Sequence, residues 1–443
     1  MNKRILKFLI GLLLIIIISV AVYWIPPVHS RLSWRLENIT TRIKYAFNPP
    51  EESIFLPSPI TQTAFPELTT ETPTIITTSS TATVSPDVFS ITPTISPTPL
   101  PDFVTLPNVV YVDQHNRWNY CGPSNLTMAL NYWGWKGTRD DVAAIVKPGI
   151  QDMSLDFIQQ GRSDKNVMPY EMTDYVQDYT DYNVVLRYGG DIDLIKKLVA
   201  AGFPVVAEKG YYEEDYTGKI GWLGHYQFVT GYENGIQSLI VQDTYNDGPN
   251  FRIPYEKFTD GWRSFNFVFF IVYPPQRDFE VFRLLGQWAD PNWGYQHALD
   301  LAEADIQNLT GIDLFFAWFN KGTSLVKLGR YADAAKAYDQ AFLLNSELGT
   351  DKQQRPYRMM WYQTGPYMAY YYSGRYGDVI NLADITLETI SPPTLEESFY
   401  WRGMAEIAIG QSQAGIDDLR ESVRLNPYFT AGISALANLG LQP

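Results

Sequence analysis

The chain has 443 residues, a formal net charge of −14 and one cysteine. The length indicates two or three domains, because domains usually contain roughly 100–200 residues. The negative charge argues against nucleic acid as a partner and against adhesion to anionic lipid headgroups, and a single cysteine excludes an intramolecular disulfide bond.

Residues 1–50 are predicted to contain a cytoplasmic N-terminus, a transmembrane anchor at about 8–25 and a juxtamembrane segment. Residues 8–25 are almost continuously apolar, and their number reaches the lower end of a membrane-spanning length. A cleaved signal peptide is the alternative, but the apolar run is long and no clear small-residue cleavage site follows it. We therefore expect a single-pass protein of the cell membrane with its later domains outside the cytoplasm.

Residues 51–104 are rich in Thr, Ser and Pro, and no Lys, Arg or Gly occurs between positions 51 and 102. Such a composition cannot bury a core and favours extended conformations. At about 3.1 Å per residue, this length could reach on the order of 100 Å. We expect a disordered linker that holds the next domain away from the membrane, with a glycosylated stalk as the alternative.

Residues 105–276 are predicted to form a compact α+β domain, because helical periodicity comes first and apolar runs typical of an antiparallel sheet follow. The pair Asn234-Gly235 between two of these runs predicts a hairpin. Having its own helices and strands, the domain is expected to fold without the rest of the chain. Besides the helix after Cys121, the predicted helices are 140–146, 170–178 and 192–201, and the predicted strands are 109–112, 203–207, 226–232, 238–243 and 266–273.

Cys121 lies where a loop is expected to turn into a helix. Apolar residues recur at helical spacing after it, and Pro123 suits a first helical turn. The helix dipole and free N–H groups at such a position stabilise a thiolate. This is the placement that a nucleophilic cysteine needs, whereas the alternative is a small, buried and inert cysteine.

A thiolate nucleophile needs a base, and the base needs a group that orients it. His225 opens the first strand of the predicted hairpin, and Asp243 closes the second, so antiparallel pairing brings them together. Asp243 can then accept a hydrogen bond from the imidazole and fix its tautomer. Asp247 is a rival, but it precedes Gly248 and is expected to bond local backbone. The structural alternatives are a histidine that only caps a strand and an aspartate that only starts a turn.

Acyl transfer also needs hydrogen-bond donors for the oxyanion. The backbone N–H of Cys121 is one candidate at the helix start. The residues alone do not choose a second donor among Gln114, Asn116 and Asn119, which all precede the cysteine.

Gln114, the segment 119–124 around the cysteine, the segment 224–232 around His225 and the segment 241–243 resemble the bacteriocin-processing cysteine peptidases, which cut double-glycine leaders, in their stand-alone form. The resemblance covers about residues 106–275. It implies a papain-like fold in which Cys121 is the nucleophile, His225 the base, Asp243 the orienting residue and Gln114 the oxyanion donor. Tyr120 departs from the family, since many relatives carry Asp or Asn before the cysteine, without a direct loss of chemistry. The transporter-linked members work beside an export pore, and this chain shows no transporter segments, so the leader substrate is not implied.

Residues 281–443 are predicted to form all-α tetratricopeptide-type repeats. The first copy matches the family pattern of Trp, Gly, Tyr and Ala at fixed offsets, and two less regular copies follow. Gly329 and Gly374, which end the first helix of the first two copies, are further apart than the unit length of about 34 residues, so the middle repeat carries an insertion. Stacked helix pairs expose a concave surface, where we expect a protein partner.

The sequence therefore predicts an N-terminal transmembrane helix, an α+β papain-like cysteine peptidase domain and an all-α repeat domain. The expected reaction is hydrolysis of peptide bonds in a peptide or protein substrate through a Cys-His-Asp triad, without a metal ion or cofactor. A transpeptidase or amidase that uses the same triad is one alternative. A catalytically inactive binding or scaffold protein is the other.

Overall fold

The computed structural model describes residues 11, 54–58, 99–115, 117, 119–148, 165–214, 220–348, 355–356, 358–388 and 394–442. The expected anchor at about 8–25 and most of the linker at 51–104 lie outside these residues. Among the helices that the structure describes, none combines the length and the apolar character needed to cross a bilayer.

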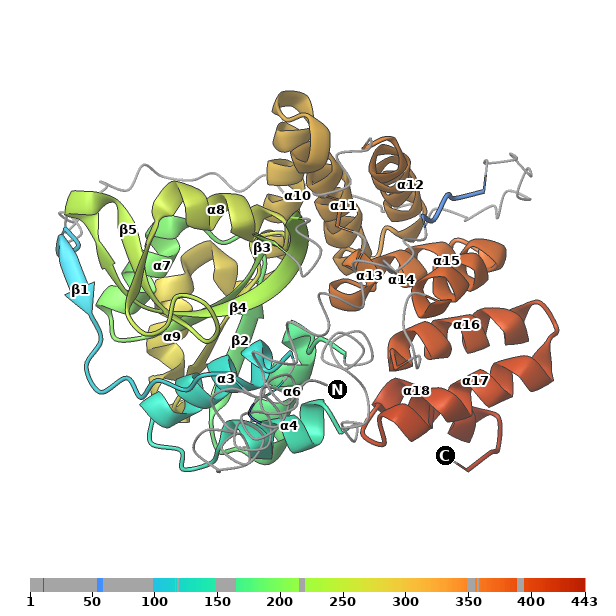
Figure 1. Cartoon of the computed structure of the whole chain (residues 1–443), viewed down its shortest axis with the longest axis horizontal. Helices are drawn as coiled ribbons and strands as arrows, with labels where there is room; N and C mark the ends of the chain where they lie inside the picture. The colour runs from blue at the N-terminus through green and yellow to red at the C-terminus, as the bar shows by residue number, and fades with distance from the viewer. Residues whose placement is uncertain are drawn as a thin grey trace, which may run out of the picture.

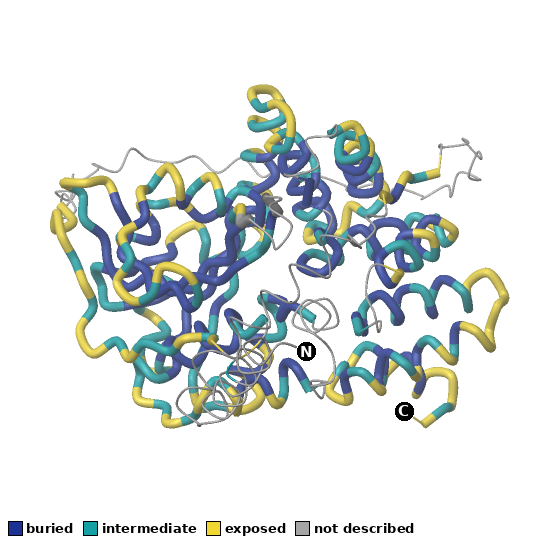
Figure 2. Tube along the Cα trace, viewed as in Figure 1, coloured by how far each residue is buried: buried dark blue, intermediate teal, exposed yellow. Residues whose placement is uncertain are grey.

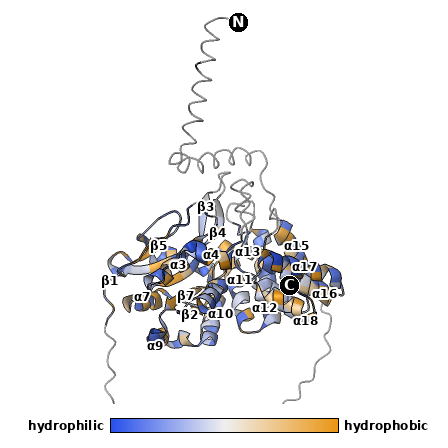
Figure 3. Cartoon of the chain, turned by 90° about the horizontal axis from the view of Figure 1, so that it is seen from below, coloured by the Kyte–Doolittle hydropathy of each residue, from blue (hydrophilic) through white to orange (hydrophobic). Residues whose placement is uncertain are grey.

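Two bodies lie side by side in the two views of Figures 1 and 3, a sheet-containing body and an array of helices. The first body is mixed α/β. Its strands form one antiparallel sheet in the order β2-β7-β3-β4-β5-β6, with β1 paired to β4. The strands are β1 (Phe103–Thr105), β2 (Asn183–Arg187), β3 (Val205–Glu214), β4 (Ile220–Glu233), β5 (Ser238–Asp243), β6 (Phe251–Pro254) and β7 (Phe269–Tyr273).

Helices cover both faces of this sheet. Val206 of β3 packs in one cluster with the helices at 121–132, 139–146 and 169–179. Val205 and Ala207 point to the other face and pack in a second cluster with the helices at 192–200 and 255–263. This alternation follows from the two-residue period of a strand, and Figure 2 shows the buried trace running through the strands. The helices are α3 (Cys121–Tyr132), α4 (Arg139–Val146), α6 (Pro169–Tyr179), α7 (Ile192–Ala200) and α8 (Tyr255–Arg263).

The strand expected at 109–112 does not form. The first strand is β1, which pairs with the end of β4, and Val109 and Val112 instead pack as half-buried residues against the α3 cluster. The apolar residues at 109–112 are therefore partly buried but are not paired in a strand. Strands β2 and β6 and helix α8 were not predicted.

The second body consists of helices in antiparallel pairs. Gly329, Gly374 and Gly410 end the first helix of three successive pairs, with φ values of 73°, 72° and 88°, a conformation in which a Cβ atom is strained. This confirms the turn positions predicted for the repeats.

Short 3₁₀ turns occur at Asn234–Ile236 (η1), Pro275–Arg277 (η2) and Gly286–Ala289 (η3). Helix α9 (Asp278–Leu285) packs in the apolar cluster of the sheet-containing body with α7. The helices of the second body are α10 (Pro291–Asn308), α11 (Gly311–Lys327), α12 (Tyr331–Glu347), α13 (Met359–Tyr362), α14 (Gly365–Tyr372), α15 (Tyr376–Glu388), α16 (Glu396–Ala408), α17 (Ser412–Leu425) and α18 (Thr430–Asn438).

The two bodies share an apolar cluster. The ring of Trp222 in β4 lies 5.3 Å from Phe316 in α11 and 5.6 Å from Tyr362 in α13, and the ring of Phe265 lies 5.8 Å from Tyr362. All four side chains are buried. A chain cut after residue 276 would expose part of this cluster, and the independent folding of the first body remains a prediction.

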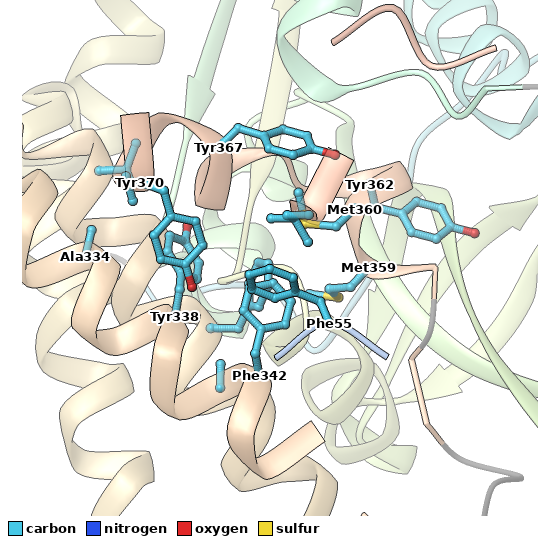
Figure 4. Packing of buried hydrophobic residues seen from close by; sticks show 14 of the residues in the cluster. Phe55, Ala334, Tyr338, Phe342, Met359, Met360, Tyr362, Tyr367 and Tyr370 are labelled. Carbon is cyan, nitrogen blue, oxygen red and sulfur yellow. The ribbon is translucent and has the colours of Figure 1, made fainter. Parts of the chain in front are cut away.

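The linker also departs from the expectation of a disordered spacer, at residues 54–58. Phe55 is buried against the repeat helices, where Figure 4 shows its ring among Phe342, Met359 and Tyr370. A composition rich in Thr, Ser and Pro does not exclude a single aromatic anchor.

Candidate active site

Helix α3 places Cys121 at its first residue, where the sequence predicted a helix start. The side chain is buried, with 7% of the residue exposed. The side chain of the preceding Tyr120 makes no capping hydrogen bond to this helix. The N–H groups of the first turn point toward the end of the helix that carries Cys121. Asn125 ties this turn to β4, because its Nδ2 donates to the carbonyl oxygens of Cys121 at 2.8 Å and of Tyr226 at 3.0 Å.

Strands β4 and β5 bring His225 and Asp243 together. His225 Nε2 lies 3.1 Å from Asp243 Oδ2, and both residues are buried. Gln227 Nε2 donates to the same oxygen at 2.7 Å. The other carboxylate oxygen accepts from the backbone N–H groups of Tyr245 at 2.9 Å and Asn246 at 3.0 Å. Four donors therefore hold the Asp243 carboxylate in one orientation.

A β-bulge at residues 229–231 makes this meeting possible. Between the bulge and the hairpin turn, Gly231 pairs with Ile240 and Glu233 with Ser238. On the other side of the bulge the register is shifted by one residue, and Asp243 pairs with Gln227. If the turn-side register continued, Asp243 would lie opposite Phe228, on the other face of the sheet. The extra residue of the bulge returns Asp243 to the face that carries His225.

His225 also lies close enough to Cys121 for each group to shift the pKa of the other. Since Nε2 faces Asp243, Nδ1 is the ring nitrogen left for sulfur. Burial raises the pKa of Cys121, but the hydrogen bond and positive charge of His225 outweigh it, so this pKa lies below its ordinary value. Burial lowers the pKa of His225, but Asp243 more than reverses this and raises it to about 10. The arrangement favours a thiolate beside an imidazolium.

Asp243, at the end of β5, and Asp247, in the turn after it, have pKa values that are shifted in opposite directions. Burial raises the pKa of Asp243, but His225 and the donors of Gln227 and Tyr245 hold it well below its usual range. Asp247 is exposed, and its partial burial and the charge of Asp243 raise its pKa. Asp243 is therefore the carboxylate that contacts His225.

Gln114 is oriented by Thr244, the residue after Asp243. Thr244 Oγ1 donates to Gln114 Oε1 at 2.7 Å, and the Gln114 backbone N–H donates to the Thr244 carbonyl oxygen at 2.9 Å. The amide oxygen is therefore used, and Nε2 is the donor turned away from Thr244. Of the rival donors, Asn119 has a positive φ of 46°, and Asn116 lies outside the described residues.

Several polar residues of the site were not predicted. Gln227 could have been found, because it follows His225 by two positions and shares its strand face. No local sequence pattern pointed to Glu208 or Lys147. Burial and then the charge of Cys121 raise the pKa of Glu208 well above its ordinary value, and the charge of Lys147 lowers the pKa of Cys121.

The repeat body contributes Tyr362, which packs on Gly224, the residue before His225. A Cβ atom on Gly224 would lie 2.7 Å from the Tyr362 ring, so only glycine fits there. Burial raises the pKa of Tyr362 to about 12, and the Gly224 backbone N–H and the charge of Cys121 both act on its hydroxyl. Tyr362 and Glu208 also line a cavity of about 800 Å³ between the two bodies. In the part of the chain that the structure describes, no group of three His, Cys, Asp or Glu side chains could hold a metal ion.

Comparisons with known proteins agree with this division. The model of the Peptidase_C39 like family matches residues 106–269, and that of the tetratricopeptide repeat matches residues 315–348. The chain thus contains a C39-like peptidase-family domain followed by a tetratricopeptide repeat. No curated protein matches it.

Three solved structures are similar to part of the chain. A C39-like peptidase from Bacillus anthracis is 20% identical and covers 39% of this chain and 98% of its own, with a TM-score of 0.31. The peptidase domain of Streptococcus ComA, a bi-functional ABC transporter involved in a quorum sensing pathway, is 14% identical over 38% and 98%, with a TM-score of 0.27. Xylellain, a cysteine protease from Xylella fastidiosa, is 16% identical over 40% and 87%, with a TM-score of 0.27. These TM-scores are too low to transfer any property.

Proposed function

We propose that the domain at residues 105–276 is a cysteine peptidase that hydrolyses peptide bonds. Cys121 is the nucleophile, His225 the general base and acid, Asp243 the orienting residue, and the Cys121 N–H and Gln114 Nε2 the oxyanion donors. The observation that supports this most is His225, which contacts a carboxylate held by three further donors and lowers the pKa of the only cysteine of the chain.

In the proposed reaction, the Cys121 thiolate attacks the peptide carbonyl carbon and a C–S bond forms. The carbonyl oxygen takes the negative charge, which the two oxyanion donors stabilise. Collapse breaks the C–N bond, and the His225 imidazolium gives its proton to the leaving amine. His225 then takes a proton from water, which attacks the thioester and releases the acid and the thiolate.

A substrate needs a route to this site, because Cys121 is buried. We propose that this route starts at the cavity between the two bodies, whose lining includes Glu208 and Tyr362 but not Cys121 or His225. Its size suits a short stretch of peptide. The repeats form one wall of this cavity, which favours a protein or peptide substrate held by both bodies.

Two other functions use the same residues. A transpeptidase or amidase would differ only in the acceptor or donor of the acyl group. An inactive scaffold would keep the polar cluster for stability. The low pKa of Cys121 favours an active site, because a structural cysteine does not need a thiolate.

The test is a mixed peptide library incubated with the full chain in H₂¹⁸O and analysed by mass spectrometry. Hydrolysis predicts new C-termini that carry ¹⁸O and disappear with Cys121→Ser. Joined peptides without the label would assign a transpeptidase. Unchanged peptides, together with a Cys121 that a thiol reagent does not label at pH 6–7, would assign a scaffold.

The proposed location is the outer face of the cell membrane, with residues 8–25 as an uncleaved anchor. Sodium carbonate extraction of native membranes is the test, because it releases proteins that are not inserted. Full release of a protein that begins near residue 30 would assign a cleaved signal peptide instead.

A further inference from the structure

Phe55 lies far from the rest of the globular chain in sequence, yet it is buried in the repeat body. Its exposed fraction is 5%. The ring meets Phe342 of α12 edge-on, with centroids 4.9 Å apart, and lies 6.1 Å from Tyr370 of α14. The flanking residues Ile54 and Leu56 are exposed, at 38% and 55%. One aromatic side chain therefore anchors this segment.

A polar contact fixes the direction of the segment. The backbone N–H of Ser58 donates to Asp378 Oδ1 at 2.9 Å. Asp378 is buried and also accepts from Arg375 Nε at 2.7 Å, and Arg375 in turn bonds Asp339 at 2.7 Å. Charge-assisted bonds of this kind are stronger than neutral ones. The carboxylate is thus held in place to receive a main-chain donor.

The pocket for Phe55 is built by more than one repeat. Phe342 belongs to the first repeat, and Tyr370 and Asp378 belong to the second. Met359 of α13, which is buried in the same cluster, comes from the insertion between them. Figure 4 shows Phe342, Met359 and Tyr370 near the Phe55 ring. The insertion that makes the middle repeat irregular therefore supplies part of one wall.

The linker is also fixed at its other end. Tyr232 Oη donates to the Pro101 carbonyl oxygen at 2.9 Å, and the Asn234 N–H donates to that of Asp102 at 2.8 Å. Strand β1 then pairs with β4. Residues 59–98 consequently join two fixed points on the same globular unit.

We propose that the repeats carry a binding site for an extended segment with one buried aromatic anchor, and that its occupant is residues 54–58 of the same chain. The Thr/Ser/Pro-rich residues 59–98 then form a closed loop and do not act as a stalk. The distance between a membrane anchor and the globular unit is set by the residues before 54. A partner that binds this surface of the repeats must displace the segment. None of this depends on peptidase activity.

Disulfide trapping tests the proposal in the full chain. In a Cys121→Ser background, Ser58→Cys and Asp378→Cys put two thiols at the observed contact, and a mild oxidant closes them. The matched control pairs Ser58→Cys with Ser412→Cys, an exposed position at the start of α17. Peptide mapping should find an intrachain disulfide in the first pair at a rate at least about tenfold above the control.

Phe55→Ala in the first pair should slow closure about tenfold, since burial of a phenylalanine side chain is worth more than one factor of ten in an equilibrium. Leu56→Ala, which removes an exposed side chain, should change the rate less than about twofold. Equal rates for both cysteine pairs, or no effect of Phe55→Ala, would overturn the docking. Disulfide-linked dimers in place of the intrachain product would make a second copy the donor and overturn the closed loop.

Discussion

The Cys121 site and the Phe55 site are both buried, but different forces hold them. Around His225 the geometry depends on short directional bonds, in which one carboxylate satisfies four donors. Around Phe55 it depends mainly on apolar surface, with one main-chain bond at the end. Directional polar sites lose function when one atom changes, whereas apolar sites lose affinity in proportion to the surface removed. The predictions below test this difference.

The largest effect is expected for His225→Ala. Without the imidazolium, burial dominates and the pKa of Cys121 returns to or above the ordinary thiol value near 8.5. At pH 6–7 the thiolate fraction, and with it the rate of iodoacetamide alkylation, should fall by about 100-fold or more. The rise of the rate with pH should occur at lower pH in the unsubstituted chain than in the variant, because His225 lowers the pKa of Cys121. Equal rates in both proteins would reject the pairing.

The next effect is expected for Asp243→Asn, which keeps the shape of the side chain but removes the charge that orients His225. Turnover should fall by on the order of 10–10⁴-fold, the range between a weak and a required orienting role. Asp247→Asn is the matched control, because Asp247 is exposed, and it should change turnover little. If the damage occurred in the control instead, the register of β5 would be wrong. The alkylation rate of Cys121 serves where no substrate is known.

The local parts of this site could be predicted from the sequence. The helix after Cys121, the hairpin strands and the repeat glycines all follow from periodicity and turn residues, and the structure has them. The roles of Cys121, His225, Asp243 and Gln114 remain predictions. The bulge at 229–231 could not be foreseen, because the gain from an extra residue depends on which face the other side chains occupy.

Contacts between residues far apart in the chain could not be predicted from the sequence either. Tyr362 lies on Gly224 and Phe55 lies on Phe342, and both pairs are far apart in the chain. No periodicity connects such residues. The expectation of a disordered linker remains a prediction for most of residues 51–104, and a single buried ring such as Phe55 has no compositional signature.

Acid should weaken the polar site by a smaller, measurable amount. The pKa of Asp243 is depressed in the folded protein, so its contribution is present above the unfolded value near 3.9 and is lost as pH falls below it. The contribution should be about 1–3 kcal/mol. Urea unfolding of the unsubstituted chain and of Asp243→Asn should therefore show a constant difference in unfolding free energy between about pH 5 and pH 6, below the range in which the raised pKa of His225 adds its own pH dependence. That difference should shrink as the pH falls below 4. A difference independent of pH would mean that the aspartate is not ionised in the folded state.

The smallest effect is expected at Tyr362, where the two kinds of site meet. Its ring packs on Gly224 and Trp222. Tyr362→Phe keeps the ring and removes only the hydroxyl, whose hydrogen bonding is worth at most about 1 kcal/mol, so the alkylation rate of Cys121 should change less than about fivefold. Tyr362→Ala leaves a void against Gly224, the residue before His225, which should lower the melting temperature and slow alkylation by about tenfold. Leu343→Ala, at an exposed position of α12, is the control for a change elsewhere in the repeats. If Tyr362→Ala lowered the melting temperature without slowing alkylation, the repeats would support the fold of the first body but not the position of its histidine.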